Sequence, residues 1–112
     1  MDSYKRAAAY ADSIEKELRT LQAWQSSPPP DAAFESKQAF LADTLTFYEW
    51  LQFVLLDRVR EIVAQRGTFP QGSSVGAYAV RELDGFDEAG CLITTLCEFD
   101  SFIEGLHQGS VQ

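Results

Sequence analysis

The stretch TLTFYEWLQFVLLDR, residues 44–58, decides the fold of this 112-residue chain. Nine of its fifteen side chains are apolar, which is more than the single buried stripe of a surface helix requires. We therefore expect either the central helix of a bundle or a helix whose second apolar strip meets another molecule. Gln52 interrupts the stretch, and if it is buried its amide needs hydrogen-bond partners, such as a loop backbone.

A capping motif marks where this helix begins. Thr46 followed by Glu49 predicts a capping box, in which the Thr46 hydroxyl accepts from the Glu49 amide and the Glu49 carboxylate accepts from the Thr46 amide. Leu45 and Trp50 stand at the positions of a hydrophobic staple. On a regular helix one broad face would hold Phe47, Trp50, Leu51, Val54, Leu55, Arg58 and Ile62, and a second apolar strip would hold Phe53, Leu56 and Val63.

Three further helices complete an all-α, single-domain bundle of four main helices. The apolar periodicity predicts helices over residues 3–24, 46–66, 75–83 and 87–106. A proline-rich connector that begins with SSPPP, residues 26–30, must follow the first helix, because consecutive prolines remove backbone donors. Gly67 is expected to stop the second helix and Ser74 to cap the third. The tail after the last helix should fray.

Size and composition indicate one self-contained domain. A chain of 112 residues with 46% apolar residues can bury one core without staples or metals. Cys91 and Cys97 lie on one predicted helix, turned apart by about 240°, so they cannot easily bridge each other and are expected to be inert, packed thiols. No export signal and no apolar run of about 18 residues is found, so we expect a cytoplasmic protein with no membrane span.

The charge is concentrated in the last third of the chain. The net charge is -8, and residues 71–112 carry seven acidic groups against one basic group, Arg81. Nucleic-acid surfaces need clustered lysine and arginine, so the isolated domain should not bind RNA or DNA. Basic proteins are the expected partners, although a solvated face that keeps the domain soluble explains the same pattern.

The sequence contains no complete catalytic or metal-binding motif. The segment EGLH at 104–107 has the Glu-x-x-His spacing of di-iron bundles, but such sites need two of these motifs and His107 is the only histidine. The acidic residues between the last two helices, which match no calcium loop, are Glu82, Asp84, Asp87 and Glu88. There is no glycine-rich phosphate loop. We therefore expect no catalytic residues, no metal, no cofactor and no enzymatic activity.

Several segments together resemble a known family. AFLADT at 39–44, EWLQFV at 49–54, Arg58 and the Phe-Pro pair at 69–70 are similar to the YqcC-like family of small bacterial proteins. Members usually carry prolines where this chain has Ala39 and Asp57, and the Asp57 departure favours a straighter helix. The resemblance implies an all-helical domain of unknown function. Because the genes of this family commonly neighbour that of a tRNA pseudouridine synthase, it also implies an accessory role near tRNA modification.

The leading hypothesis is a non-catalytic protein-binding module that assists such a synthase. An apolar strip and the acidic C-terminal third would make the contact. The residues expected to bind the partner are Trp50, Phe53, Leu56, Glu82 and Asp87.

The alternative is a small-molecule-binding bundle or a small enzyme. It requires a pocket lined by Tyr48, Trp50, Gln52 and Arg58. A concave pocket with convergent polar groups would favour this reading, whereas a convex surface with exposed aromatic side chains would favour a protein partner.

Overall fold

The computed structural model describes residues 2–35 and 45–108, and it contains helices and no strand in these two segments. The elements in chain order are α1 (Ser3–Thr20), the 3₁₀ helix η1 (Asp31–Glu35), α2 (Phe47–Trp50), the π-helix η3 (Leu51–Leu55), α3 (Leu56–Gln65), α4 (Val75–Glu82), the 3₁₀ turn η4 (Asp87–Ala89) and α5 (Gly90–Gln108). Because α2, η3 and α3 follow one another without a break, they form one helix. The prediction of an all-α bundle of four main helices is confirmed.

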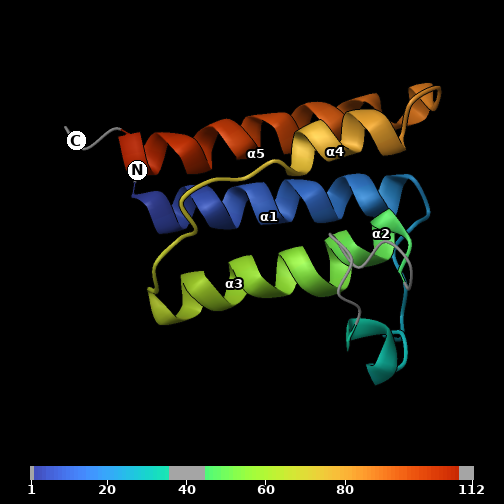
Figure 1. The fold of residues 1–112 in the computed structure, drawn as a ribbon, viewed down its shortest axis with the longest axis horizontal. Helices are drawn as coiled ribbons and strands as arrows, with labels where there is room; N and C mark the ends of the chain where they lie inside the picture. Colours follow the sequence, from blue (N-terminus) through green and yellow to red (C-terminus); the bar gives the residue numbers. More distant parts are fainter. Residues whose placement is uncertain (1, 36–44, 109–112) are drawn as a thin grey trace.

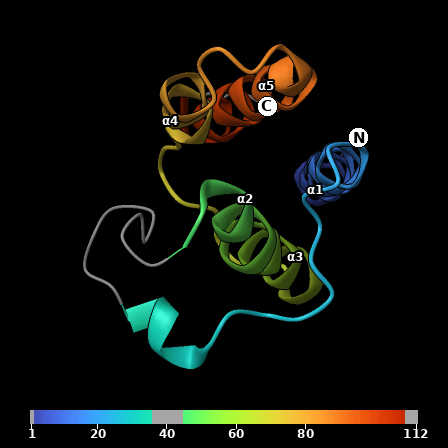
Figure 2. The ribbon, with the colours of Figure 1, turned by 90° about the vertical axis from the view of Figure 1, so that its right-hand side faces the viewer.

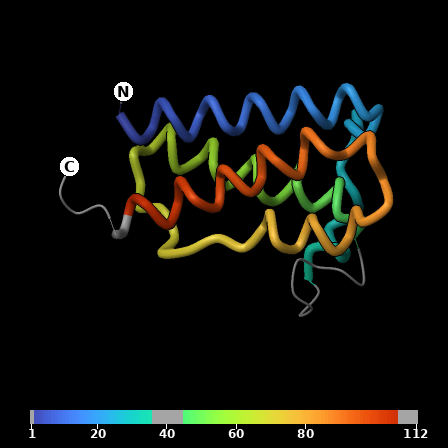
Figure 3. Tube along the Cα trace, turned by 90° about the horizontal axis from the view of Figure 1, so that it is seen from above, coloured from blue at the N-terminus to red at the C-terminus, as the bar shows by residue number. Residues whose placement is uncertain are grey.

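The helix α1 holds the bundle together. It packs against α3 on one side and against α5 on another, while α4 packs along α5. Figure 1 shows the helices running side by side, and the end-on view in Figure 2 places α1, α3 and α5 at the corners of a triangle. The beginning of α1 and the end of α5 lie at the same end of the bundle (Figure 3).

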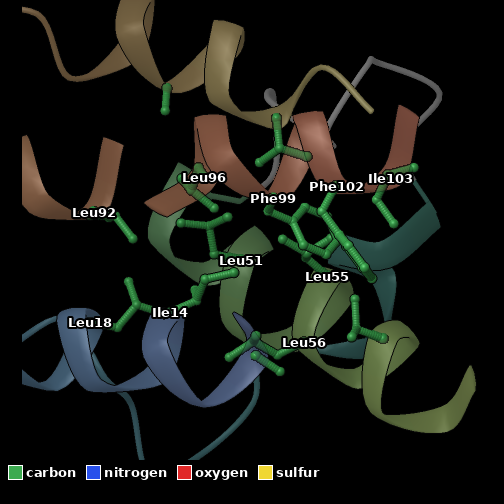
Figure 4. Close-up of a cluster of buried hydrophobic side chains, with 14 of the residues drawn as sticks. Ile14, Leu18, Leu51, Leu55, Leu56, Leu92, Leu96, Phe99, Phe102 and Ile103 are labelled. Carbon is green, nitrogen blue, oxygen red and sulfur yellow. The ribbon is translucent and has the colours of Figure 1, made fainter. Parts of the chain in front are cut away.

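The core lies where α1, the long α2–α3 helix and α5 meet. Its largest fully buried side chains are Ile14, Leu18, Leu51, Leu56, Leu92, Leu96 and Ile103. Figure 4 shows how they point toward one another from the three helices, together with Leu55, Phe99 and Phe102. Since burial of such side chains is the main favourable term in folding, this cluster fixes the helix arrangement.

The long helix begins as predicted. The Glu49 amide donates to the Thr46 hydroxyl at 3.1 Å, and the Thr46 amide donates to the Glu49 carboxylate at 2.8 Å. The capping box is therefore confirmed. The backbone hydrogen bond from Thr46 also lowers the pKa of Glu49, and the Gln25 side chain adds to this effect.

Two helices end on a non-glycine residue in the left-handed conformation. Arg66, with φ of 52°, takes this position after α3, and the Gly67 amide closes the end by donating to the Ile62 carbonyl at 2.9 Å. Gln22, with φ of 60°, does the same after α1, which ends earlier than the predicted residue 24. The prediction that Gly67 stops the helix is right about the place, but Arg66 makes the left-handed turn.

The helix α4 is capped from a distance. Ser74 is the N-cap residue, as predicted, but its side chain makes no cap hydrogen bond, so the expected side-chain contribution is wrong. The Asp100 carboxylate of α5 accepts instead from the Val75 amide at 3.0 Å, the Gly76 amide at 2.7 Å and the Ser73 hydroxyl. This carboxylate satisfies amides that the helix itself leaves unpaired.

Glycine lets α4 approach α5 closely. A Cβ built on Gly76 would lie 2.6 Å from the Cα of Cys97 and 2.8 Å from its Sγ, so no larger residue fits here without movement. Cys97 and Cys91 are both free and exposed, which corrects the expectation that the two thiols are packed.

Ion pairs and a hydrogen bond connect α1 to α3 and to Gly67 just beyond its end. The Arg60 guanidinium lies 2.9 Å from Glu15 and 3.1 Å from Asp12, and the Tyr4 hydroxyl donates to the Gly67 carbonyl at 2.7 Å. The hydrogen bond from Arg19, reinforced by that from Arg60, lowers the pKa of Glu15. These contacts join segments far apart in sequence and hold the two helices in register.

Candidate interaction surface

The π turn determines which side chains of the long helix share a face. Its hydrogen bonds span five residues, as from the Leu56 amide to the Leu51 carbonyl, so one turn holds about one residue more than an α turn. Side chains four positions apart therefore stay aligned along the helix. One such row, Leu51, Leu55 and Val59, is buried in the core.

A second row lies at the surface and separates two hollows. It consists of Trp50, Val54 and Arg58, which line both hollows, and we call it the ridge. Trp50 and Val54 are half-buried and Arg58 is exposed. The ridge thus combines an apolar base with one cationic group.

The first hollow has a volume of about 500 Å³, and we call it the acidic hollow. Besides the ridge it is lined by Phe34 of η1 and by Phe53, Asp57 and Glu61 of the long helix. Phe53 is half-buried, and the two carboxylates are exposed. Aromatic surface next to negative charge is suited to a partner that carries both an apolar group and a basic group.

The second hollow is smaller, about 220 Å³, and lies on the other side of the ridge between α3, the connector to α4, and α5. We call it the apolar pocket. Its only polar lining residues in the described part of the chain are Arg58, Ser73 and Ser74. The other lining residues are Trp50, Val54, Leu55, Val59, Ile62, Phe69, Pro70, Gly72, Val75, Phe99 and Ile103.

Of the four residues expected to line a pocket, two line these two hollows. Trp50 and Arg58 line both hollows, whereas Gln52 and Tyr48 line neither. The Gln52 amide donates to the Gln25 carbonyl at 2.7 Å and its carbonyl accepts from the Gln25 amide at 2.9 Å, which confirms the expectation of a loop-backbone partner. Tyr48 is half-buried elsewhere, and burial, followed by the charge of Glu88, raises the pKa of its hydroxyl.

The expected apolar strip is only partly at the surface. Trp50 and Phe53 are half-buried and reach the acidic hollow, but Leu56 is 0% exposed and belongs to the core. The assignment of Leu56 to a partner surface is therefore wrong. The helical wheel misplaced it because the wheel assumes a regular α-helix, while the π turn rotates the residues that follow it.

The expected acidic residues do lie at the surface, at the end of α4 and in η4 before α5. Glu82 and Asp87 are exposed, and so are the nearby Asp84 and Glu88. Among them the structure exposes two apolar side chains that the sequence analysis missed, Val80 at 52% and Phe86 at 53%. We call this group, Val80, Glu82, Asp84, Phe86, Asp87 and Glu88, the acidic corner. A phenylalanine inside the polar turn segment LDGFDE was the available signal, because such a turn offers no core for it.

Neither a metal site nor a membrane-spanning helix is found in the described residues. Within 2–35 and 45–108, no three histidine, cysteine, aspartate or glutamate residues are grouped so that they could hold a metal ion. None of the helices in these segments is long and apolar enough to cross a membrane. The arrangement offers surfaces for binding.

The fold defines the chain as a small all-α bundle with an uneven, partly apolar surface on its long helix. It belongs to the family DUF446, whose model, described as tRNA pseudouridine synthase C, matches residues 6–102. This membership confirms the resemblance to YqcC-like proteins.

Relatives in other bacteria agree with this assignment. The chain is 31% identical to the uncharacterized protein YqcC of Escherichia coli over 70% of this chain and 72% of that protein. It is 28% identical to an uncharacterized protein of Haemophilus influenzae over 78% of this chain and 82% of the relative. The solution NMR structure of E. coli YqcC superposes with a TM-score of 0.82, at 26% identity, and the match covers 93% of this chain and 90% of that one.

A third relative is much longer than the segment that aligns with this chain. Over 58 residues, 52% of this chain, the sequence is 38% identical to a protein of Pectobacterium carotovorum named tRNA pseudouridine synthase C. The matched segment makes up only 15% of that protein.

Proposed function

We propose that this chain is a non-catalytic protein-binding module that assists a tRNA pseudouridine synthase. The observation that carries the proposal is the match to 15% of a protein named tRNA pseudouridine synthase C. In that relative the matched segment is joined to the rest of the protein in one chain. Joining two modules holds them at a high effective concentration, which is useful when they act together. A separate small chain must reach the same synthase by binding to it. Such a role places the chain in the cytoplasm.

Charge supports a protein partner of this kind. A synthase that acts on tRNA needs a basic surface for phosphate groups, whereas this chain has a net charge of -8 and few basic groups in its last third. The acidic corner and the acidic hollow would be attracted to such a basic surface. Because the acidic module itself repels RNA, it would act by binding the synthase protein and not by capturing tRNA.

Two surfaces would divide the work. Around Trp50 and Phe53 the acidic hollow offers apolar area, whose burial lengthens the lifetime of a complex. The acidic corner, with Glu82 and Asp87 at the surface, would speed the encounter. Apolar Phe86 gives this corner a contact that a purely solvated face would not need.

Direct binding between two purified proteins tests the proposal. The chain is titrated against the tRNA pseudouridine synthase C of the same bacterium, and association and dissociation rates are followed at several salt concentrations. Glu82→Lys with Asp87→Lys should slow association about tenfold and reduce its salt dependence, since the attraction is lost. Phe53→Ser should mainly speed dissociation.

A matched charge change serves as control. Glu98→Lys with Glu104→Lys alters two exposed residues of α5 by the same total charge, away from the acidic corner, and should affect association less. The chain alone should bind tRNA no better than millimolar at physiological salt. If the purified synthase does not bind the chain, or if both double variants behave alike, the proposed contact is wrong.

A further inference from the structure

We propose that the apolar pocket beside the ridge binds a small carboxylate with an aromatic or branched aliphatic body. This inference does not depend on the proposed function, since it concerns the other side of the ridge and a ligand of a different class. It rests on the shape of the pocket, on the nature of its walls and on Arg58 at its rim, for which the described part of the chain offers no hydrogen bond or ion pair.

The pocket exists because one seam of the bundle is spanned by a loop. The helix α1 packs directly against α3 and α5, and α4 packs directly against α5, but the connector after α3 runs between α3 and the α4–α5 pair (Figure 1). At Gly72, in this connector, nothing lies within 4 Å of where a Cβ would be. The side chains on either side do not close the seam, and a volume of about 220 Å³ stays open.

The walls favour an apolar body. Phe69, Phe99 and Ile103 form part of the lining and are themselves buried in the core, so the pocket floor is fixed by the fold. Half-buried Trp50 and Ile62 line it as well. An unfilled apolar hollow of this kind lacks dispersion contacts on one side, so a ligand that fills it gains them. The volume suits one aromatic ring or a branched chain with a short linker.

Arg58 supplies a cation without a hydrogen-bond or ion-pair partner among the described residues. On the same helix Arg60 pairs with Asp12 and Glu15, and Arg66 lies over the Tyr4 ring at 5.1 Å. Arg58 has no hydrogen bond or ion pair within residues 2–35 and 45–108, although it lines the pocket. A guanidinium at the mouth of an apolar pocket binds a carboxylate through charge-assisted hydrogen bonds.

The other charged groups nearby do not take over this role. The first amides of α4, which would otherwise attract an anion, already donate to Asp100. Asp57 and Glu61 line the acidic hollow and not this pocket. Ser74 lines the pocket and its side chain makes no cap hydrogen bond, so its hydroxyl can add a second polar contact. The carboxylate of a ligand is therefore expected at Arg58.

NMR titration of the labelled chain with 3-phenylpropanoate tests the inference, and the neutral 3-phenylpropanamide serves as the matched probe. We expect shifts of the Gly72 and Ser73 amides, the Trp50 indole and the Ile103 methyl groups, with a dissociation constant on the order of 1 mM for the acid. The amide should bind roughly three- to tenfold more weakly, because it lacks the charge that Arg58 pairs with.

Variants separate the two parts of the site. Arg58→Gln should abolish the preference for the acid, whereas Arg81→Gln, a change of an exposed arginine outside the pocket, should keep it. Ile62→Phe should fill the pocket and remove binding of both probes. Should that variant unfold, Val54→Trp offers a second way to close the mouth from a half-buried position. No shifts at about 10 mM acid, shifts away from the pocket, or equal binding of acid and amide would each overturn the proposal.

Discussion

The two sides of the long helix differ in how they are closed. On the side of α1, Arg60 bridges to Asp12 and Glu15, and the Gln52 amide joins the Gln25 backbone through two hydrogen bonds. The ridge, by contrast, stands between the acidic hollow, which η1 borders, and the apolar pocket, which the connector and α5 border. The core shared with α1 and α5 thus takes up only part of the apolar residues of this stretch. The remainder forms the surface on which binding can occur.

The sharpest test of this difference compares two neighbouring apolar residues. Leu56→Ala should lower the free energy of unfolding by about 2–5 kcal/mol, because Leu56 is fully buried. Phe53→Ala, although it removes a larger side chain, should lower it by only about 1–2 kcal/mol, because Phe53 is half-buried at the acidic hollow. Urea unfolding of both variants measures the two values. A larger loss for Phe53→Ala than for Leu56→Ala would place Phe53 in the core and remove it from the proposed interface.

The closely packed seam between α4 and α5 should tolerate no added volume. Gly76→Ala places a methyl group 2.6 Å from the Cys97 backbone, and we expect a loss of about 2–3 kcal/mol. Gly105→Ala is the matched control inside α5, where nothing lies within 4 Å, and it should stabilise by about 0.5–1 kcal/mol. Thermal unfolding of the two variants should therefore move the midpoint in opposite directions.

Removing the hydrogen-bonded Gln52 side chain should cost more stability than removing the charge of Arg58, which has no partner within residues 2–35 and 45–108. Gln52→Ala leaves the Gln25 amide and carbonyl without their partner, so stability should fall by about 1–3 kcal/mol. Arg58→Gln, at the ridge, should change stability by less than about 0.5 kcal/mol. Equal losses in chemical denaturation would mean that Arg58 has a structural role and would weaken its assignment to a ligand.

The last comparison concerns the dependence of stability on pH. The pKa of Glu15 is lowered in the folded state by hydrogen bonds from Arg19 and Arg60, so its contribution is present above the ordinary pKa of 4.5 and is lost as the pH falls through the lowered value. Glu15→Gln should therefore destabilise the protein at pH 7 by less than about 1 kcal/mol, and the difference should shrink on acidification. Unfolding midpoints between pH 7 and about pH 3 follow this change. If the stability difference between the two proteins grows at low pH, the Glu15 carboxylate does not stabilise the fold in the way proposed.

Much of the fold could be predicted because its signals are local. The capping box of Thr46 and Glu49 needs only residues three apart, and apolar periodicity located all four main helices. The cap of α4 could not be predicted in this way, because Asp100 reaches it from another helix. The close approach of α4 to α5 at Cys97 likewise could not be predicted, because Gly76 permits it but does not reveal it in the sequence.

The site residues were harder to predict, and one feature explains most of the errors. A helical wheel assumes a constant turn, so the π turn at 51–55 moved Leu56 from the expected surface strip into the core. Gln52 was correctly expected to need backbone partners, and in the structure it pairs with Gln25 and lines neither hollow. Trp50 and Arg58, which were predicted to line a pocket, lie on the ridge and border both hollows.

The left-handed residues at the ends of α1 and α3 show that this sequence has not reached the stability its backbone allows. Gln22 and Arg66 each hold a conformation that costs a non-glycine residue about 1–2 kcal/mol and glycine far less. Selection keeps proteins above a threshold of stability and does not drive them to the maximum, so such strain can persist. Arg66 offsets part of it by lying over the Tyr4 ring. Gln22 is therefore the position at which an engineer could raise the stability of this bundle without touching either hollow.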